Sequence, residues 1–217
     1  MNYLSILSII FYAVSLSSCI AGQKLILINN NVISVGLMVF PITYFIGAMI
    51  TELYGFKQTK IIIITSATCN IIISLYFYLT ITLEPFYLWP LQNHYEIFLT
   101  KTCWILITSS VAYTSSEYIN ATILSKLNII TKGQFLLLRA IASISIAIII
   151  DAFLMLPVII INSSATISNV IFSLIFYKLI YILTAMPLFV LLTNAIKIKD
   201  NADATRNNTH LSSVNYV

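Results

Sequence analysis

The sequence predicts an all-α integral membrane protein with six transmembrane helices and with both termini in the cytoplasm. Hydrophobic residues make up 59% of the 217 residues, against about 45–50% in soluble domains. Charged residues make up only 8%, against about 25% in soluble domains. So apolar a surface is not compatible with water, and the apolar residues also gather in segments long enough to cross a bilayer.

Six apolar segments define the expected helices, because a transmembrane helix needs about 20 residues to cross a hydrocarbon core of about 30 Å. The six segments form a single domain over residues 1–196. The polar residues 197–217 are expected to be a disordered cytoplasmic tail. The expected spans are residues 3–21, 32–52, 59–82, 102–124, 135–161 and 170–195.

The first span carries no charged residue. It ends in Leu16-Ser17-Ser18-Cys19, which is similar to a bacterial lipoprotein cleavage box. Secretory signals carry a Lys or Arg ahead of their apolar segment. None precedes this box, so we expect an uncleaved helix. All three cysteines, Cys19, Cys69 and Cys103, lie in apolar segments and are expected to act as small hydrophobic side chains.

The second span ends at Glu52, after a run that contains Pro41 and two glycines. These residues permit a bent or broken helix in which a substrate could meet the backbone. The alternative is an interfacial glutamate that ends a helix beside Lys57 and Lys60. The third span follows, and it leads into an aromatic, proline-containing loop at residues 84–101 that is typical of a membrane interface.

The fourth span carries a polar stripe. Ser110, Thr114, Glu117 and Asn120 recur at spacings of four and three, so they share one helix face. An ionised side chain at a helix centre costs about 2.5–3.5 kcal/mol on insertion scales. The stripe therefore predicts a water-filled or substrate-filled interior, and the alternative is a stripe that only joins helices.

The fifth and sixth spans carry three further charges. Arg139, Ser143 and Asp151 lie at spacings of four and eight, and about 18 Å separates Arg139 from Asp151 along the axis. Each charge therefore needs a partner on another helix or a ligand. Lys178 is expected to neutralise Asp151, and Glu117 is closer in depth to Arg139. The alternative for Lys178 is that it reaches toward the interface.

The basic residues predict the orientation. With a cytoplasmic N-terminus, seven Lys and Arg lie inside and two lie outside, as the positive-inside rule requires. The net charge of +4 therefore reflects topology and lipid contact, and it does not indicate a nucleic-acid partner. The inner residues are Lys57, Lys60, Lys126, Lys132, Lys197, Lys199 and Arg206, and the outer ones are Lys24 and Lys101.

Three motifs in this order resemble the queuosine precursor transporter family, also called the vitamin uptake-like or YhhQ family. They are the run from Phe40-Pro41 to Thr51-Glu52-Leu53-Tyr54-Gly55, then Arg139 with Ser143 and Asp151, and then Lys178 nine residues before Pro187. The resemblance covers about residues 20–195.

The resemblance implies a multi-pass transporter of the bacterial inner membrane. It would import 7-cyano- and 7-aminomethyl-7-deazaguanine for tRNA modification. The expected partners are a small deazapurine base and membrane lipid, with no nucleic acid, cofactor or metal and no enzymatic activity. The expected substrate-binding or transport residues are Thr51, Glu52, Glu117, Asn120, Arg139, Ser143, Asp151 and Lys178, and the candidate stacking residues are Tyr44, Tyr113 and Tyr118.

The chemistry of the bases suits a carboxylate. A guanine-type edge offers a ring N–H and an exocyclic amine, and one carboxylate of Glu52 or Glu117 could accept both. The chain departs from the family pattern where acidic or polar residues are replaced. These departures allow a different substrate, such as queuine or another vitamin-like base. The replacing residues are Ala48, Asn120, Ala140, Ile144 and Ile148.

Two alternatives remain open. The chain could be the substrate-binding subunit of an energy-coupling-factor importer, since it has no nucleotide-binding motif of its own. In a different class, it could be a membrane scaffold that transports nothing, in which buried charges pair to fix the order of the helices. Proton coupling through Glu117 or Asp151 is a further hypothesis, and an energising partner or a homo-oligomer is not predicted either way.

Overall fold

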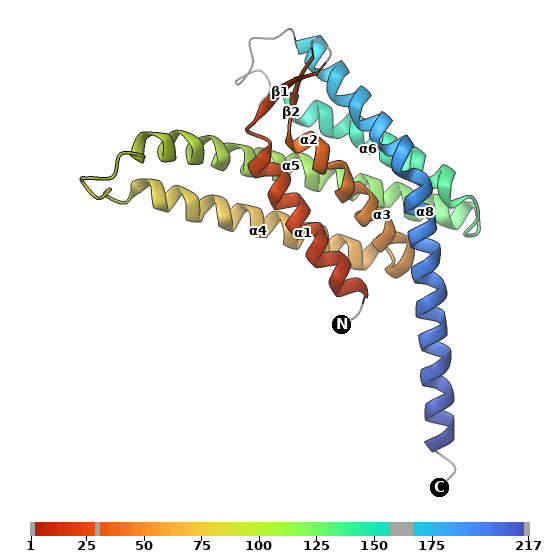
Figure 1. The fold of residues 1–217 in the computed structure, drawn as a ribbon. Coiled ribbons are helices and arrows are strands. Elements are labelled where there is room, and N and C mark those ends of the chain that lie inside the picture. The colour runs from red at the N-terminus through yellow and green to blue at the C-terminus, as the bar shows by residue number, and fades with distance from the viewer. Residues whose placement is uncertain (1–2, 29–30, 157–166, 215–217) are drawn as a thin grey trace.

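The protein is a bundle of long helices, seen in a computed structural model that describes residues 3–28, 31–156 and 167–214 (Figure 1). Side chains are described for these residues except at 31–32, 167–174 and 200–214. Six described helices are long and apolar enough to cross a membrane. The predicted all-α class with six membrane-spanning helices is confirmed, and the chain is a multi-pass membrane protein. The orientation of the termini stays a prediction.

The described part of the chain contains two strands and seven helices. They are α1 (Tyr3–Ala21), β1 (Leu25–Ile28), β2 (Asn31–Ser34), α2 (Gly36–Val39), α3 (Pro41–Tyr54), α4 (Phe56–Thr82), α5 (Gln92–Ile130), α6 (Leu136–Leu154) and α8 (Ile167–Val214).

A small β-hairpin stands where the sequence predicted a loop and the start of the second span. β1 and β2 pair antiparallel, with Ile26 opposite Ile33. The N–H of Val35 donates to the carbonyl oxygen of Lys24 at 2.8 Å and closes the hairpin. The β-branched residues of this segment favour a strand. The second span therefore begins at Gly36, and the prediction of residue 32 was wrong.

The helices also extend beyond the predicted spans. α5 covers residues 92–130, although residues 92–101 were predicted as loop, and α8 is helical through Val214. Hydropathy reports where a helix crosses lipid, and polar turns continue the same helix beyond that region. α6 ends at Leu154, and residues 157–161 of the fifth predicted span lie outside the described residues. The division of the chain at residue 196 stays a prediction.

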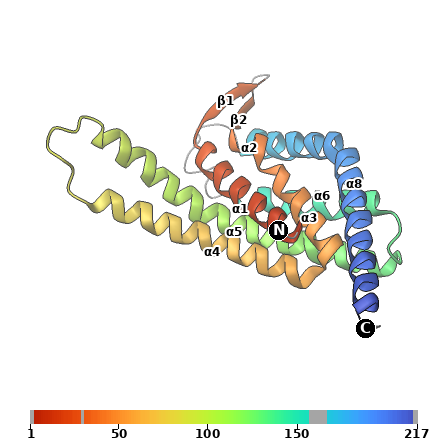
Figure 2. The ribbon, with the colours of Figure 1, turned by 60° about the horizontal axis from the view of Figure 1, so that its bottom comes forward.

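The long α4–α5 hairpin forms one side of the bundle (Figures 1 and 2). α5 also packs against α6, which packs against α8, while α1 and α3 contact both α4 and α5. The connected ends of α4 and α5 project beyond the other helices in both views. α5 is therefore the helix with neighbours on several sides, and its centre lies in the core.

Polar side chains hold these helices together from inside. The amide of Asn70 on α4 donates to the hydroxyl of Ser15 on α1 at 3.2 Å, and Ser74 donates to the carbonyl oxygen of Cys103 on α5 at 3.2 Å. The outward face of α4 carries large exposed apolar residues such as Ile72. This arrangement, small and polar inside and apolar outside, is typical of helices that pack in lipid.

Two prolines interrupt the helices. Pro41 begins α3 directly after the short α2, where its missing N–H is tolerated. Pro187 lies inside α8, which bends in both views (Figures 1 and 2). A proline within a helix removes one backbone hydrogen bond and causes such a bend.

Candidate functional site

The second membrane span, formed by α2 and α3, passes three groups of polar side chains in turn. Phe40 lies beside Lys178, Gly47 beside Glu117, and Glu52 beside Arg139. Helical rise separates these three levels by about 10 Å and about 7.5 Å. The Glu117 level is therefore flanked by a charged group on each side.

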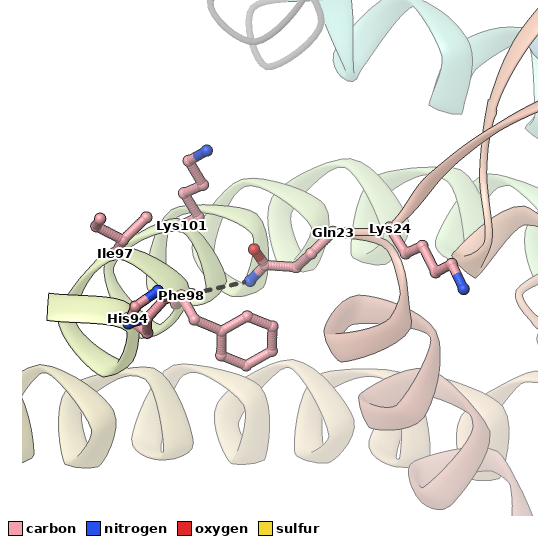
Figure 3. A pocket seen from close by; sticks show the side chains of 6 residues that line it. All are labelled: Gln23, Lys24, His94, Ile97, Phe98 and Lys101. Carbon is pink, nitrogen blue, oxygen red and sulfur yellow. Dashed lines mark hydrogen bonds between the residues drawn. The ribbon is translucent and has the colours of Figure 1, made fainter. Parts of the chain in front are cut away.

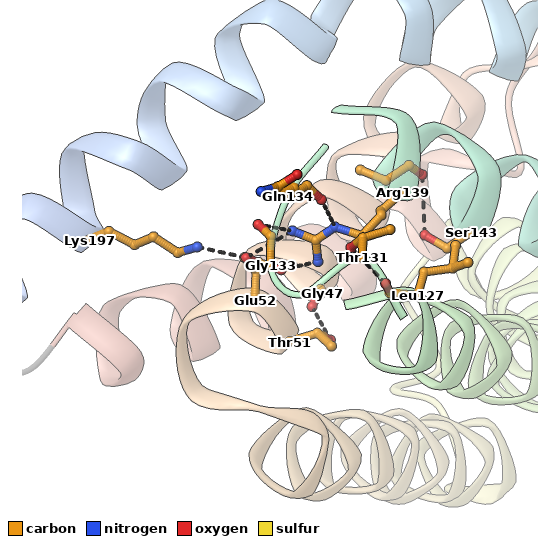
Figure 4. A network of polar contacts seen from close by, with 11 residues as sticks. Gly47, Thr51, Glu52, Leu127, Thr131, Gly133, Gln134, Arg139, Ser143 and Lys197 are labelled. Atoms are coloured by element: carbon orange, nitrogen blue, oxygen red, sulfur yellow. Dashed lines mark hydrogen bonds and ion pairs between the residues drawn. The ribbon is translucent and has the colours of Figure 1, made fainter. Parts of the chain in front are cut away.

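Glu52 lies between two cations (Figure 4). The guanidinium of Arg139 donates to its Oε2 at 2.9 Å and to its Oε1 at 3.3 Å, and the ammonium of Lys197 donates to Oε1 at 2.6 Å. The side chains of Glu52 and Arg139 are only 3% and 2% exposed. The sequence placed Glu117 closer in depth to Arg139, but the carboxylate that binds the guanidinium is that of Glu52 on α3.

Arg139 also fixes the loop between α5 and α6. Its Nε donates to the carbonyl oxygen of Gln134 at 2.8 Å, and its Nη2 donates to that of Gly133 at 3.1 Å. Gly133 and Phe135 adopt positive φ angles of 81° and 55°. One arginine therefore joins α3, α6 and a tight loop, and Lys197 adds α8 to the same group.

Lys197 was missed as a site residue by the sequence analysis, which assigned it to the polar tail. Its position at the end of an apolar helix offered a signal, since lysines near helix ends reach back along the helix. Thr51, which was predicted, donates to the carbonyl oxygen of Gly47 at 2.8 Å and contacts the hydroxyl of Thr59 on α4 at 3.0 Å. In this conformation Thr51 joins α3 to α4.

The second ion pair joins α6 to α8. Lys178 donates to Oδ2 of Asp151, and the two residues are only 5% and 2% exposed. The prediction that Lys178 neutralises Asp151 is confirmed, so the lysine does not reach toward the interface. Its ammonium also lies 4.9 Å from the centre of the Phe40 ring. Ser143 is buried between the two pairs on α6 and donates to the carbonyl oxygen of Ala140 at 3.2 Å.

Glu117 lies in the core without a cation among the described residues. It is fully buried, and its Oε2 accepts one hydrogen bond of 3.2 Å from the amide of Asn120. Buried polar atoms without a hydrogen-bond partner gather on the same helix within the described chain: Tyr113 OH, Thr114 Oγ1, Glu117 Oε1 and Asn120 Oδ1. We call Tyr113, Thr114, Glu117 and Asn120 the Glu117 cluster.

Gly47 faces this cluster from α3. A Cβ atom added there would lie 2.7 Å from Oε2 of Glu117 and 3.3 Å from its Cδ. A distance under 3.0 Å is too short for such a contact, so any larger residue at 47 would displace the carboxyl group. Glycine at position 47 therefore allows the Glu117 carboxyl group to pack directly against the backbone of α3.

Two of the three candidate stacking residues lie near the cluster. The hydroxyls of Tyr44 and Ser116 are 3.4 Å apart, and the ring of Tyr113 packs 5.4 Å from that of Phe40. Tyr118 lies apart, 41% exposed, with its ring beside Phe56. Tyr44 and Tyr113 are thus the two candidate stacking residues that the bundle buries at the Glu117 level.

A cavity of about 470 Å³ lies elsewhere, at the end of α1 and along α5 (Figure 3). The side-chain amide of Gln23, which lines this cavity, donates to the backbone carbonyl oxygen of Phe98 at 3.2 Å. Lys24 and Lys101 border this cavity but point away from each other. The cavity therefore brings no charged groups together, and it is separate from the Glu117 cluster. Its lining residues are Gln23, Lys24, His94, Ile97, Phe98 and Lys101.

Residues 34–192, more than half of the chain, match the family model described as "Putative vitamin uptake transporter". The match begins at the end of β2 and extends into α8, so it includes the Glu117 cluster, the Glu52–Arg139 pair and the Asp151–Lys178 pair, while Lys197 lies outside it. No curated protein and no solved structure matches the chain.

Proposed function

The chain belongs to the vitamin uptake transporter family, and from that premise we propose that it imports 7-deazaguanine bases across a bacterial inner membrane. The bases are 7-cyano- and 7-aminomethyl-7-deazaguanine, the precursors of the tRNA nucleoside queuosine. The observation that carries this substrate class is the Glu117 cluster, a buried carboxyl with unpaired polar atoms beside it.

The cluster offers the hydrogen-bonding groups that a guanine-type edge needs. The free Oε1 of Glu117 and the free Oδ1 of Asn120 are acceptors, and the ring N–H and exocyclic amine of the base are donors. The hydroxyls of Tyr113 and Thr114 can both donate and accept. Unpaired buried polar groups cost about 1–3 kcal/mol each, so a ligand that pairs with them gains much of its binding energy at this place.

Transport requires that the helices around the cluster separate. Glu117 and Asn120 are fully buried, so the described conformation is closed to a ligand from either side. The Glu52–Arg139–Lys197 group lies on one side of the cluster, and the Asp151–Lys178 pair lies on the other. In our proposal the Glu52–Arg139–Lys197 group and the Asp151–Lys178 pair open in turn, as in transporters that expose a central site alternately to each face.

A second candidate function is favoured by the ion pairs themselves. Lys178 and Lys197 tie α8 to α6 and α3, which is also what a membrane scaffold without transport would need. Importers of queuine, or a substrate-binding subunit of an energy-coupling-factor system, remain alternatives within the transport class. These readings differ in which base is taken up, and in whether any base is.

The test is uptake in a bacterial host that can neither make nor import queuosine precursors but retains the enzymes that use them. The chain is expressed, each deazapurine base is supplied separately at low concentration, and queuosine is measured in tRNA. We expect one base to restore queuosine. Glu117→Gln should abolish this restoration, whereas Glu96→Gln, on the same helix but outside the cluster, should leave it intact.

Membrane insertion of each variant is verified by its amount and its size-exclusion profile in detergent. Restoration by queuine alone would identify a different substrate for the same site. Failure with every base, despite correct insertion, would contradict the proposed function and favour the scaffold. Restoration that needs a co-expressed ATPase would identify the subunit of an energy-coupling-factor system.

A further inference from the structure

The buried charges of the described bundle leave one carboxyl group unmatched. Asp151 faces Lys178, and Glu52 faces both Arg139 and Lys197. Glu117, fully buried, is given a hydrogen bond only by a neutral amide, that of Asn120. An isolated buried carboxylate costs far more than a paired one, and such a group takes up a proton instead.

The other ionisable groups near Glu117 do not supply the missing positive charge. On its own helix there is Tyr113, on α3 there is Tyr44, and on α6 there is Asp151, whose charge is matched by Lys178 of α8. The residues that α4 and α1 bury carry no ionisable group, apart from the thiol of Cys19 beside Ser109. Asp151, when ionised, opposes a second negative charge at Glu117.

From this arrangement we infer that Glu117 carries a proton in the empty protein and releases it when a ligand donates N–H groups to its carboxylate. The substrate and the proton then compete for one site. The inference rests on the proposed function, because it needs a base with two N–H donors.

When the base binds, the O–H bond of the Glu117 carboxyl group breaks, and the proton leaves to the solvent through water that enters as the bundle opens. Two N–H groups of a neutral base then donate to the resulting carboxylate, which replaces the stabilisation that the proton gave. Hydrogen bonds to an ionised acceptor are about twice as strong as those between neutral groups, so the anion is the better acceptor for the base.

The competition has a defined pH dependence. Below the pH at which the empty protein loses this proton, each fall of one pH unit makes the bound proton ten times harder to displace. The dissociation constant of the base should therefore rise tenfold per unit of acidification in that range, and it should be independent of pH above it.

The experiment uses the purified full-length protein in detergent and the neutral probe 7-cyano-7-deazaguanine. Difference infrared spectroscopy records the carbonyl stretch of a protonated carboxyl group before and after the base is added. Titration calorimetry in two buffers with different ionisation enthalpies counts the protons released per base bound. We expect the stretch in the empty protein, its loss on binding, and one proton released.

Two variants assign the signal. Glu117→Gln should lack the carboxyl stretch even without base, so this comparison holds whether or not that variant binds. Glu96→Gln should keep the stretch. Absence of the stretch in the empty wild-type protein, or binding without proton release, would overturn the inference and leave the proposed function standing. Failure of the wild-type protein to bind any deazapurine base would instead overturn the proposed function, and the inference with it.

Discussion

Asp151 and Lys178 illustrate what a single buried pair contributes. Removing one partner of a buried pair leaves an uncompensated charge and typically costs about 3–5 kcal/mol. Removing both charges can be nearly neutral. Lys178 also lies over the Phe40 ring, so replacing the lysine removes more than one contact.

We therefore expect Asp151→Asn to lower the melting temperature strongly, and Lys178→Met to do the same. The Asp151→Asn, Lys178→Met double variant should recover much of this loss. Thermal unfolding in detergent, followed by tryptophan fluorescence, measures the melting temperatures of the single and double variants. A double variant less stable than either single one would contradict the pairing. If the double variant is stable but no longer restores queuosine in tRNA, the pair serves transport and not only assembly.

Some of the site residues could be paired from the sequence and others could not. The Asp151–Lys178 pair followed from equal depth in neighbouring helices, because both residues lie well inside long apolar spans. Depth did not identify the partner of Arg139, because Glu117 lies one level away on α5, whereas α3 carries Glu52 to the guanidinium. Only the placement of α3 in the folded bundle decides between them, and one sequence does not contain that information.

Among the elements, α8 is the one whose shape the sequence signals most directly. Pro187 lies between Lys178 and Lys197, and each lysine bonds to a carboxylate on a different helix. The bend in α8 therefore lies between its two anchor points. A helix that must loosen each anchor in turn needs flexibility there, which the missing backbone hydrogen bond provides.

We expect Pro187→Ala to slow uptake of the base severalfold, while its melting temperature stays equal or rises, because the alanine restores a helix hydrogen bond. Leu188→Ala, at a 60% exposed neighbouring position, is the matched control and should leave uptake unchanged. Both quantities are measured on the same preparations. Unchanged uptake in Pro187→Ala would show that the bend serves only to fit α8 to its neighbours.

Element boundaries show where hydropathy stops being informative. The cores of the predicted spans coincide with helices, but α5 and α8 continue well past the apolar residues. The β1–β2 hairpin was missed because its strands have only four residues each and lie directly before an apolar span. Such short runs do not separate a strand from the end of a helix by periodicity alone.

For the whole molecule, the distribution of basic residues predicts which end of the bundle faces the cytoplasm. The predicted inner side carries Lys57, Lys132 and Lys197 among seven basic residues, against two on the other side. The structure brings the Glu52 group to the end of the bundle that carries the first of these lysines. Positive-inside asymmetry predicts that this end lies in the cytoplasm.

This orientation predicts the labelling of single cysteines introduced into a background without native cysteines. Tyr87→Cys, at an 85% exposed position between α4 and α5, should react with a membrane-impermeant maleimide on intact cells. Lys132→Cys, in the loop between α5 and α6, should react only after the cells are lysed. The reverse pattern would invert the topology, and equal labelling of both positions would show that the chain inserts in two orientations.

The order of α6 and α8 along the chain has a consequence for biosynthesis. The ribosome releases α6, with Asp151, before Lys178 is synthesised, so the growing chain holds an acid in lipid without its counter-cation. Insertion of α8 then supplies Lys178 to Asp151 and Lys197 to Glu52. A chain that stops before Lys178 keeps an unpaired buried charge, which is strongly destabilising. The bond between α6 and α8 therefore distinguishes chains that contain α8 from chains that lack it, and we expect membrane proteases to degrade the latter.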